Sequence, residues 1–266
     1  MAGAEMADPG TGLAKPDRYY GTLRTDMVPE LPDPLGRVLD IGCASGLTGT
    51  LLRPRNPTRL VGIEINADAA AAARQIYDEV LVGPAEEMMG SLHENFDTVL
   101  CYDVLEHMVD PWAVLAQAAR VCVAGGRLHV SVPNARHVSL MLDVMLRGTF
   151  NYQEHGHRDN THLRWFTPRD LETAIEGAGF EVRTRSHPPF SWPRRLLGRL
   201  TGARSDEFLA GQWQVLAVRT GDPQAGGPGL TSTAVPPQSA SGTTGAPDSD
   251  RNSRTAFLAP PKIALL

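Results

Sequence analysis

The sequence predicts a three-layer α/β fold built on a mostly parallel sheet. Short runs rich in Val, Ile and Leu alternate with helical patterns between residues 36 and 219, and strands separated by helices are typical of parallel βαβ units. A chain of 266 residues is long enough for one domain of roughly 200 residues plus tails. We therefore expect a disordered N-terminus at 1–15, a folded domain at 16–220, and a disordered Pro/Gly/Ser-rich tail at 221–266.

Composition excludes several classes of protein. The formal net charge of -5 indicates neither a nucleic-acid surface nor a membrane surface as the main partner. The three cysteines, Cys43, Cys101 and Cys122, lie in apolar segments without CxxC spacing, so buried thiols are expected rather than disulfides or a metal site. The N-terminus lacks a signal-peptide core, and no run approaches the roughly twenty apolar residues of a membrane span. A reduced, cytoplasmic protein is the simplest expectation.

A buried strand followed by a turn of small residues opens the predicted domain. Residues 37–41 form a short apolar run, and Gly42, Ala44 and Gly46 follow it before a helical pattern begins. Such a turn lets a ligand approach bare backbone N–H groups at the start of a helix.

Two ligand classes use a turn of this kind. The dinucleotide fingerprint requires a small residue at its sixth position, where this chain has Leu47. The pattern Asp-x-Gly-x-Gly-x-Gly fits better, with Ala44 in place of one glycine, and it resembles motif I of the class I S-adenosylmethionine-dependent methyltransferases. A tight turn of an unrelated α/β protein is the alternative. The residues that the resemblance places at the cofactor here are Asp40, Gly42, Cys43 and Gly46.

The second strand ends on a candidate ribose ligand. Residues 59–64 form an apolar run that ends at Glu64, 22 positions after Gly42 and close to the spacing of about 20 at which an acid meets a ribose. A carboxylate at a strand tip can accept hydrogen bonds from both vicinal hydroxyls. A solvated acid at the strand end is the alternative.

The third strand, at 79–82, leads to the place where the resembling family carries an adenine-binding aspartate. Pro84 stands at that position here. The resemblance then implies that the Ala85 backbone, Glu86 or shape alone recognises adenine. Glu86 as an ordinary acid of a first helical turn is equally open.

The fourth strand carries the second strong motif. Residues 96–107 closely resemble the strand-four motif of the same family, Phe-Asp-x-Val followed by Asp-Val-Leu-Glu-His. Ligands of open α/β sheets bind outside the carboxyl ends of the strands, so the resemblance places Tyr102, Asp103 and His107 near the methionine end of the cofactor. His107 is a candidate base, and local packing is the alternative.

The rest of the domain follows the same order. A helix at 111–123 should end at Gly125-Gly126, and the strand at 127–133 precedes Asn134 as the family's Val-Pro-Asn does. Later strands are predicted at 180–185 and 213–219. The resemblance implies a Rossmann-like class I methyltransferase domain with a seven-stranded, mostly parallel sheet and an antiparallel last strand.

The acceptor should meet the segment at 135–167, which begins with an apolar helix candidate at 138–146. His155, His157 and His162 crowd its second half. A metal site is not expected, because the spacing matches no helical His-x-x-x-His pattern and no cysteine joins the group. We expect a lid over the active site, with His162 as first candidate base and His107 as second. The alternative is a loop clamp of Asp159, Thr161 and Arg164 in which His162 only packs.

The resemblance implies an S-adenosylmethionine-dependent methyltransferase acting on a small-molecule or glycan hydroxyl. N-methylation of a small amine, an NAD-dependent oxidoreductase and a catalytically silent nucleotide-binding module are the alternatives. A basic insertion at about 188–211 has an amphipathic pattern that fits either a solvated helix or a membrane-surface or anionic-substrate contact.

Overall fold

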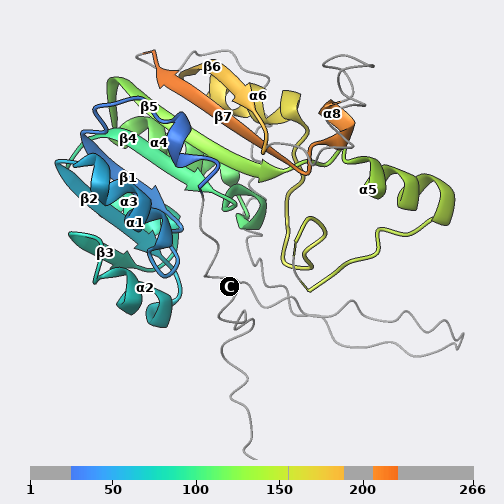
Figure 1. The fold of residues 1–266 in the computed structure, drawn as a ribbon, viewed down its shortest axis with the longest axis horizontal. Helices are drawn as coiled ribbons and strands as arrows, with labels where there is room; N and C mark the ends of the chain where they lie inside the picture. Colours follow the sequence, from blue (N-terminus) through green and yellow to red (C-terminus); the bar gives the residue numbers. More distant parts are fainter. Residues whose placement is uncertain (1–24, 155, 189–205, 221–266) are drawn as a thin grey trace, which may run out of the picture. The chain divides into compact units, whose positions relative to one another are not determined.

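The computed structural model of the chain describes residues 25–154, 156–188 and 206–220. Within them lies one seven-stranded sheet in the order β3-β2-β1-β4-β5-β7-β6 (Figure 1). Strand β7 pairs antiparallel with both β5 and β6, and every other pair of neighbouring strands is parallel. The predicted fold class is therefore confirmed. The strands are β1 Arg37–Ile41, β2 Arg59–Glu64, β3 Glu79–Val82, β4 Phe96–Tyr102, β5 Cys122–Pro133, β6 Phe180–Ser186 and β7 Gln212–Arg219.

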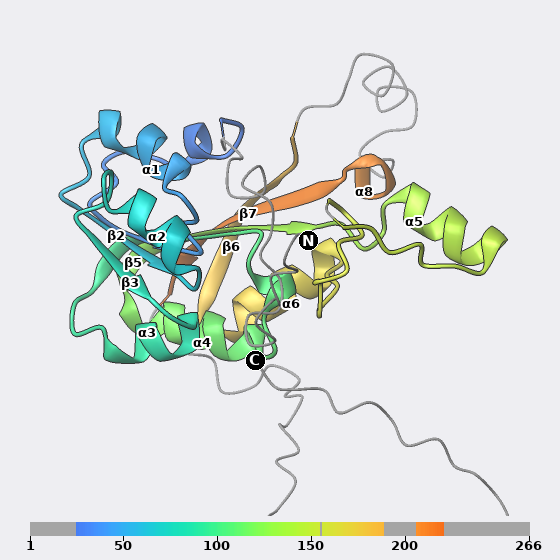
Figure 2. The same ribbon diagram turned by 90° about the horizontal axis from the view of Figure 1, so that it is seen from below.

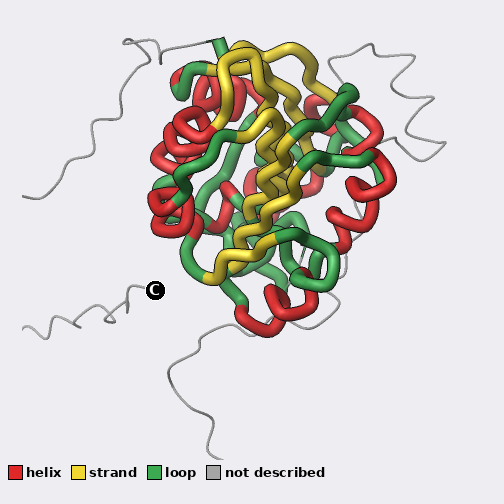
Figure 3. The backbone as a smooth tube through the Cα atoms, turned by 90° about the vertical axis from the view of Figure 1, so that its left-hand side faces the viewer, coloured by secondary structure: helices red, strands yellow, loops and turns green. Residues whose placement is uncertain are grey.

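Helices cover both faces of the sheet. Figures 2 and 3 show the strands as a central layer with helices on either side. On one face lie α1 Leu47–Leu52 and α2 Ala67–Ala73, and on the other lie α3 Ala85–Ser91, α4 Pro111–Val121 and α6 Pro168–Gly177. Shorter elements are η1 Val28–Glu30, η2 Arg53–Arg55, η3 Leu105–His107, α5 Val138–Leu142, the π-helical turn η4 Asp143–Arg147 and α8 Asp206–Leu209.

Each strand feeds two hydrophobic cores because successive side chains point to opposite faces. In β1, Leu39 and Ile41 pack toward α3 and α4, whereas Val38 packs toward α1 and α2. All three are fully buried, and each such burial contributes about 1.5–3 kcal/mol. The continuous apolar runs seen in the sequence are the consequence of this two-sided burial.

Some boundaries differ from the sequence-based expectation. Helix α4 ends at Val121, and the two glycines expected to end it lie inside β5, where Gly125 has a φ of +75°. The reason is that Cys122 is buried and already pairs with Phe96 at the start of β4. Near the N-terminus Pro29 lies within the 3₁₀ turn η1.

Other expectations concern segments that the structure leaves undescribed. The N-terminal residues 1–24, residues 189–205 of the basic insertion and the tail at 221–266 lie outside the described residues.

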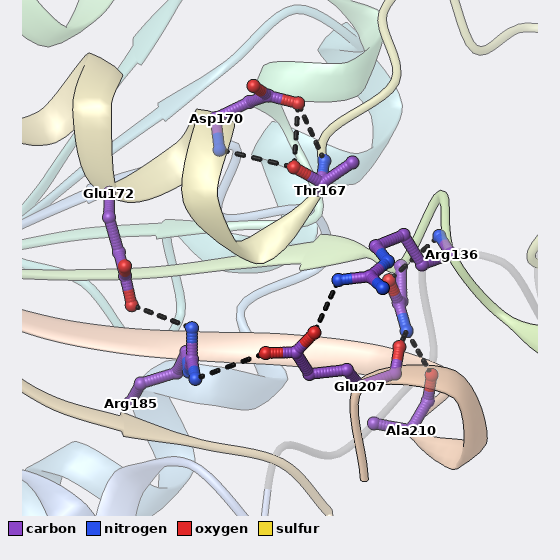
Figure 4. Close-up of polar contacts among 8 residues, drawn as sticks. Arg136, Thr167, Asp170, Glu172, Arg185, Glu207 and Ala210 are labelled. Atoms are coloured by element: carbon purple, nitrogen blue, oxygen red, sulfur yellow. Dashed lines mark hydrogen bonds and ion pairs between the residues drawn. The ribbon is translucent and has the colours of Figure 1, made fainter. Parts of the chain in front are cut away.

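Helix α6 begins with a capping box. The Thr167 hydroxyl accepts a hydrogen bond from the Asp170 N–H, and the Asp170 carboxylate accepts from the Thr167 N–H and hydroxyl (Figure 4). Such a cap is worth about 1 kcal/mol. Pro168 occupies the first helical position, where its missing N–H costs no hydrogen bond.

The end of β5 is tied to α8 and therefore to the start of β7. The Asn134 amide donates to the carbonyl oxygens of Glu207 and Ala210, both at 2.8 Å. The Glu207 carboxylate lies between the guanidinium groups of Arg136 and Arg185 (Figure 4). These contacts hold the segment after β5 against the sheet.

Candidate active site

The predicted site lies where the parallel strands end. Strands β1 and β4 are neighbours, and the strand order reverses between them. Open α/β sheets bind their ligands outside the carboxyl ends of the strands at such a switch point. Ile41, Glu64 and Tyr102 end three of the strands at this edge.

The turn after β1 needs its glycines for two reasons. Gly42, Ala44 and Gly46 have φ values of +75°, +49° and +91°, a region that favours glycine. A Cβ on Gly42 would also lie 2.4 Å from Cγ2 of Val104, and one on Gly46 would lie 3.0 Å from a backbone carbon of α2. The missing side chain at Gly42 thus lets the residue that precedes η3 rest on this turn.

The N–H groups of the turn are used within the protein. Those of Gly42 and Cys43 donate to the Ile63 carbonyl at 2.8 and 3.0 Å, and that of Gly46 donates to the Cys43 carbonyl at 2.9 Å. The Ala44 N–H donates to the Glu64 carboxylate at 2.9 Å. The expectation of bare N–H groups is therefore wrong for these four amides, because three of them donate to the end of β2 and the fourth, Gly46, donates within the turn.

Glu64 joins the glycine turn to the next helix. Its Oε1 accepts from the Asn66 N–H at 2.8 Å, and its Oε2 accepts from the Ala44 N–H. Asn66 in turn caps α2 with its side chain. The Glu64 carboxyl is buried, and burial raises its pKa. Each carboxylate oxygen can accept a further hydrogen bond, so both N–H contacts are compatible with a ribose ligand.

Asp40 and Cys43 face the interior. The Asp40 carboxylate accepts a hydrogen bond from the Tyr77 hydroxyl, and burial raises the pKa of that tyrosine. Burial likewise raises the pKa of the Cys43 thiol. Its sulfur packs over Gly62 so closely that a Cβ on this glycine would lie 2.6 Å from Sγ. Both side chains support the turn from behind.

The side chains of Tyr102 and Asp103, at the end of β4, have different surroundings. The Tyr102 hydroxyl lies 2.8 Å from Nδ1 of the fully buried His129, so its side chain belongs to the interior. Asp103 has a φ of +55°, and its Oδ1 accepts from the Ser131 hydroxyl at 2.9 Å and from the Gln212 amide. The Asp103 carboxylate is thereby held across the ends of β4, β5 and β7.

Ala85 and Glu86 begin α3 directly after the carboxyl end of β3. Pro84 occupies the N-cap position without a side-chain cap. Ala85 is buried and Glu86 is partly buried. Their position at the tip of the strand beside β2 is the one that the resemblance predicted for adenine contacts.

The segment at 135–167, which was predicted to meet the acceptor, is hydrogen-bonded to η3. The N–H groups of Leu163 and Arg164 donate to the Glu106 carbonyl at 2.7 and 3.0 Å. Asp159 accepts from the Thr161 N–H at 2.9 Å and from its hydroxyl at 2.6 Å. The Asp159–Thr161 part of the expected loop clamp is present, and the bonds to Glu106 hold the segment against the turn that carries His107, the second candidate base.

The two candidate bases meet. The ring centroids of His107 and His162 are 4.8 Å apart in an edge-to-face arrangement. His107 Nδ1 lies 3.3 Å from the Thr161 carbonyl oxygen. One ligand atom each from Glu106, His107 and His162 lies within 4.8 Å of the others. This group can move a proton, and its donor set could also hold a divalent cation.

The other histidines of the segment do not join this group. His157 Nδ1 lies 3.1 Å from the Gly211 carbonyl, at the start of β7. Burial, with a smaller contribution from His137, lowers the pKa of His157 to about 4. His155 lies outside the described residues. The crowding of histidines in the sequence is therefore not a single site.

A comparison with known families decides the assignment. Residues 14–185, more than half of the chain, match the family described as a methyltransferase domain. The chain belongs to this family. It is a class I S-adenosylmethionine-dependent methyltransferase.

Relatives support the assignment. The methyltransferase is 26% identical over 215 residues to a ubiquinone biosynthesis O-methyltransferase of Xylella fastidiosa, which covers 75% of this chain and 82% of the relative. The corresponding protein of Aeromonas salmonicida is 28% identical over 183 residues, covering 66% of this chain and 76% of the relative.

Solved structures share the fold. A methyltransferase from Archaeoglobus fulgidus aligns with a TM-score of 0.50 at 19% identity, covering 70% of this chain and 87% of that one. A possible histamine N-methyltransferase from Thermotoga maritima aligns with a TM-score of 0.50 at 21% identity, covering 71% and 84%.

The residues of this methyltransferase fit its cofactor. An acid at the tip of β2, Glu64, stands beside a turn whose glycines leave no side chain at Gly42 and Gly46.

Among the helices of the described residues, none combines the length and the apolar character that a membrane span requires.

Several residues of the site were missed by the sequence analysis. Tyr77, Ser131 and Gln212 bind candidate residues from strands or loops distant in sequence. No local pattern marks them. Glu106 could have been singled out, because it is an acid inside the strand-four motif beside His107.

Proposed function

We propose that this methyltransferase moves the methyl group of S-adenosylmethionine to a hydroxyl group of a small-molecule acceptor. The observation that carries the proposal is the ring contact between His162 and His107, which lies three residues beyond the Val104 that packs on the turn at Gly42. A hydroxyl group becomes a good nucleophile when a base takes its proton, and histidine is suited to that task near neutral pH. An oxygen acceptor is the substrate for which such a pair is useful.

Each cofactor-binding role follows from a position at the sheet edge. S-adenosylmethionine would supply a methyl group on a positively charged sulfur, already activated for displacement. Glu64 would accept hydrogen bonds from the ribose hydroxyls through its remaining lone pairs. The Gly42–Gly46 turn would line the methionine and ribose side, with Asp103 at the methionine end. Ala85 and Glu86 would meet the adenine end. Asp40 and Tyr102 would support this surface from the interior.

The chemistry then requires alignment and one proton transfer. The acceptor oxygen would attack the methyl carbon while His162 takes the hydroxyl proton. His107, placed by its contact with the Thr161 carbonyl, would orient His162 or serve as the second base. Alignment at about 3 Å can contribute roughly 7–11 kcal/mol to the rate. General base catalysis adds about 10²–10⁴-fold.

The relatives favour oxygen over nitrogen as the acceptor atom. Those compared above are named O-methyltransferases, whereas one structural neighbour is titled a possible histamine N-methyltransferase. A neutral amine needs no base to attack, so amine methylation should survive loss of His162. Labelled cofactor with phenols, sugar alcohols, glycans and amines would identify the acceptor. Faster methylation of an amine than of any hydroxyl would overturn the proposal.

The cofactor assignment has its own test. Glu64→Ala should weaken binding of S-adenosylmethionine about tenfold, because one to two hydrogen bonds to a charged group are lost. Isothermal titration calorimetry measures this. Glu79→Ala removes an acid at the opposite end of the neighbouring strand β3 and is the matched control. Equal affinity of the Glu64 variant and the parent would argue against the ribose role.

A cytoplasmic location is also part of the proposal. The cysteines Cys43, Cys101 and Cys122 are free and buried. Burial raises the pKa of the Cys122 thiol to about 12. Buried unpaired thiols favour a reducing compartment.

A further inference from the structure

A buried acid lies behind the two candidate bases. Asp159 is 1% exposed. Its Oδ1 accepts hydrogen bonds from the N–H of Thr161 at 2.9 Å and from the hydroxyl of the same residue at 2.6 Å. Its backbone carbonyl accepts from the N–H of His162 at 3.1 Å. One residue is therefore bonded both to the backbone of one candidate base and to the threonine that faces the other.

Thr161 presents two oxygens to the ring of His107. Nδ1 of this histidine lies 3.2 Å from the threonine Oγ1 and 3.3 Å from the threonine carbonyl oxygen. A carbonyl oxygen only accepts hydrogen bonds, whereas a hydroxyl can accept or can donate its single hydrogen. The direction of the hydroxyl hydrogen thus decides whether both oxygens act alike toward the ring.

The carboxylate of Asp159 fixes that direction. It takes the hydroxyl hydrogen of Thr161 in the 2.6 Å contact, a length typical of a hydroxyl that donates to a charged oxygen. Oγ1 then turns lone pairs toward His107, as the carbonyl oxygen does. A ring nitrogen between two acceptors must carry a hydrogen, because an unprotonated one would set its own lone pair against theirs. The N–H is shared between the two oxygens in a three-centre bond.

We propose that Asp159 is a positioning residue that fixes His107 in the tautomer with the hydrogen on Nδ1. In a neutral imidazole the other nitrogen, Nε2, is then an acceptor. It can take the proton of the methyl acceptor, so that an O–H bond breaks and an Nε2–H bond forms, or it can accept a hydrogen bond from His162. This catalytic consequence rests on the proposed function, whereas the tautomer does not.

Proton uptake at Nε2 would leave the Nδ1 side of the ring unchanged. The imidazolium has a hydrogen on both nitrogens, so Nδ1–H keeps the same two oxygens of Thr161 as acceptors. A base that keeps its orientation in both protonation states needs no rearrangement while the proton moves.

NMR spectroscopy of the full chain, without cofactor or methyl acceptor, tests the tautomer. A long-range ¹H–¹⁵N spectrum of protein labelled with ¹⁵N-histidine separates protonated from unprotonated ring nitrogens. At about pH 8.5 histidines with the usual pKa of about 6.5 are neutral. The variant His107→Gln identifies the signals of His107 by their loss. We expect the Nδ1–H tautomer to exceed the other at least about fivefold, the ratio that two hydrogen bonds of ordinary net strength give.

Asp159→Ala tests the positioning role. Without the carboxylate the hydroxyl of Thr161 is released to donate to Nδ1, so we expect comparable amounts of the two His107 tautomers. Adding Thr161→Val removes this competing donor and should restore the Nδ1–H tautomer, because the carbonyl oxygen remains. Asp159→Asn keeps an oxygen at Oδ1 and should resemble the parent. Asp170→Ala is the matched control, because it breaks another threonine–aspartate pair, with Thr167, at the start of α6.

Three results would overturn the inference. The first is an excess of the Nε2–H tautomer of His107 in the parent, a measurement that does not depend on how any variant folds. The second is a parental tautomer ratio in Asp159→Ala. The third is a double variant with Thr161→Val that is as mixed as Asp159→Ala alone, because the loop would then have loosened without any turn of the hydroxyl. Thermal unfolding verifies that each variant is folded.

Turnover separates this inference from the proposed function. On the acceptor found with labelled cofactor, Asp159→Ala should lower kcat by no more than His107→Ala does, and it should lower kcat no further once His107 is replaced. A shifted tautomer with parental kcat would leave the positioning role of Asp159 standing and would remove His107 from the proposed proton transfer.

Discussion

A methyl group added to Gly62 should disturb the cofactor turn from behind. A Cβ at this position would lie 2.6 Å from Sγ of Cys43 and 3.1 Å from Cδ1 of Tyr77. Favourable carbon contacts lie at about 3.5–4.0 Å, so the sulfur would have to move by about 1 Å. Overpacking of this kind costs about 1–3 kcal/mol. Replacing glycine by alanine also stabilises the fold by about 0.4–1 kcal/mol, because it lowers the conformational entropy of the unfolded chain. The free energy of unfolding of Gly62→Ala should therefore be lower by about 1–2 kcal/mol.

The same shift should reach the cofactor. Cys43 is part of the glycine turn, and Tyr77 holds Asp40. Displacing both should weaken S-adenosylmethionine binding about tenfold, which is the effect of about 1.4 kcal/mol. Urea unfolding and titration calorimetry measure the two effects. Adding Cys43→Ala to Gly62→Ala removes the sulfur and should restore most of the stability. Parental stability and affinity in Gly62→Ala, or a double variant no better than the single one, would refute this reasoning.

Three further predictions concern the histidines. His162→Ala should lower kcat on a hydroxyl acceptor about 10²–10⁴-fold without changing cofactor affinity. His107→Ala should lower kcat less. A larger loss of kcat in the His107 variant would make His107, and not His162, the main base. His157 binds a proton in the unfolded chain near pH 6.5 but in the fold only near pH 4, so stability should be full above pH 6.5 and fall by up to about 3 kcal/mol as the pH drops through this window. His157→Gln should flatten that dependence in urea titrations, and an unchanged slope would contradict it. Dialysis against EDTA should leave turnover unchanged if His162 is the base, whereas a loss restored by Mg²⁺ would transfer the role to a cation held by Glu106 and the two histidines.

The strands could be read from the sequence because burial on both faces leaves a simple signature. Residues 37–41, 59–64 and 79–82 were predicted with the bounds that the structure shows. The end of α4 was harder, because a helix followed closely by a strand leaves no polar break between them. The two glycines at 125–126 look like a helix stop but lie within β5, where its register with β4 shifts between Cys122 and Arg127.

The sequence predicted which residues are candidates for the site, but it predicted few of the contacts between them. Strand alternation places Tyr102 on the same face as Leu100, so its inward direction was available from the pattern. The pairing of His107 with His162 was not, because it depends on backbone bonds from Leu163 to the Glu106 carbonyl across a long loop. Local sequence carries no trace of such a contact.

The contact between Gly42 and Val104 would couple the proposed cofactor site to the proposed acceptor site. On one side of this contact lies the turn that we propose lines S-adenosylmethionine, and on the other side Val104 precedes His107, the second candidate base, by three residues. The free energy of such coupling is the same whichever substrate binds first, because coupling between two binding sites is reciprocal. Binding of the methyl donor and of the acceptor should therefore be coupled. A saturating concentration of either one should change the dissociation constant of the other by the same factor.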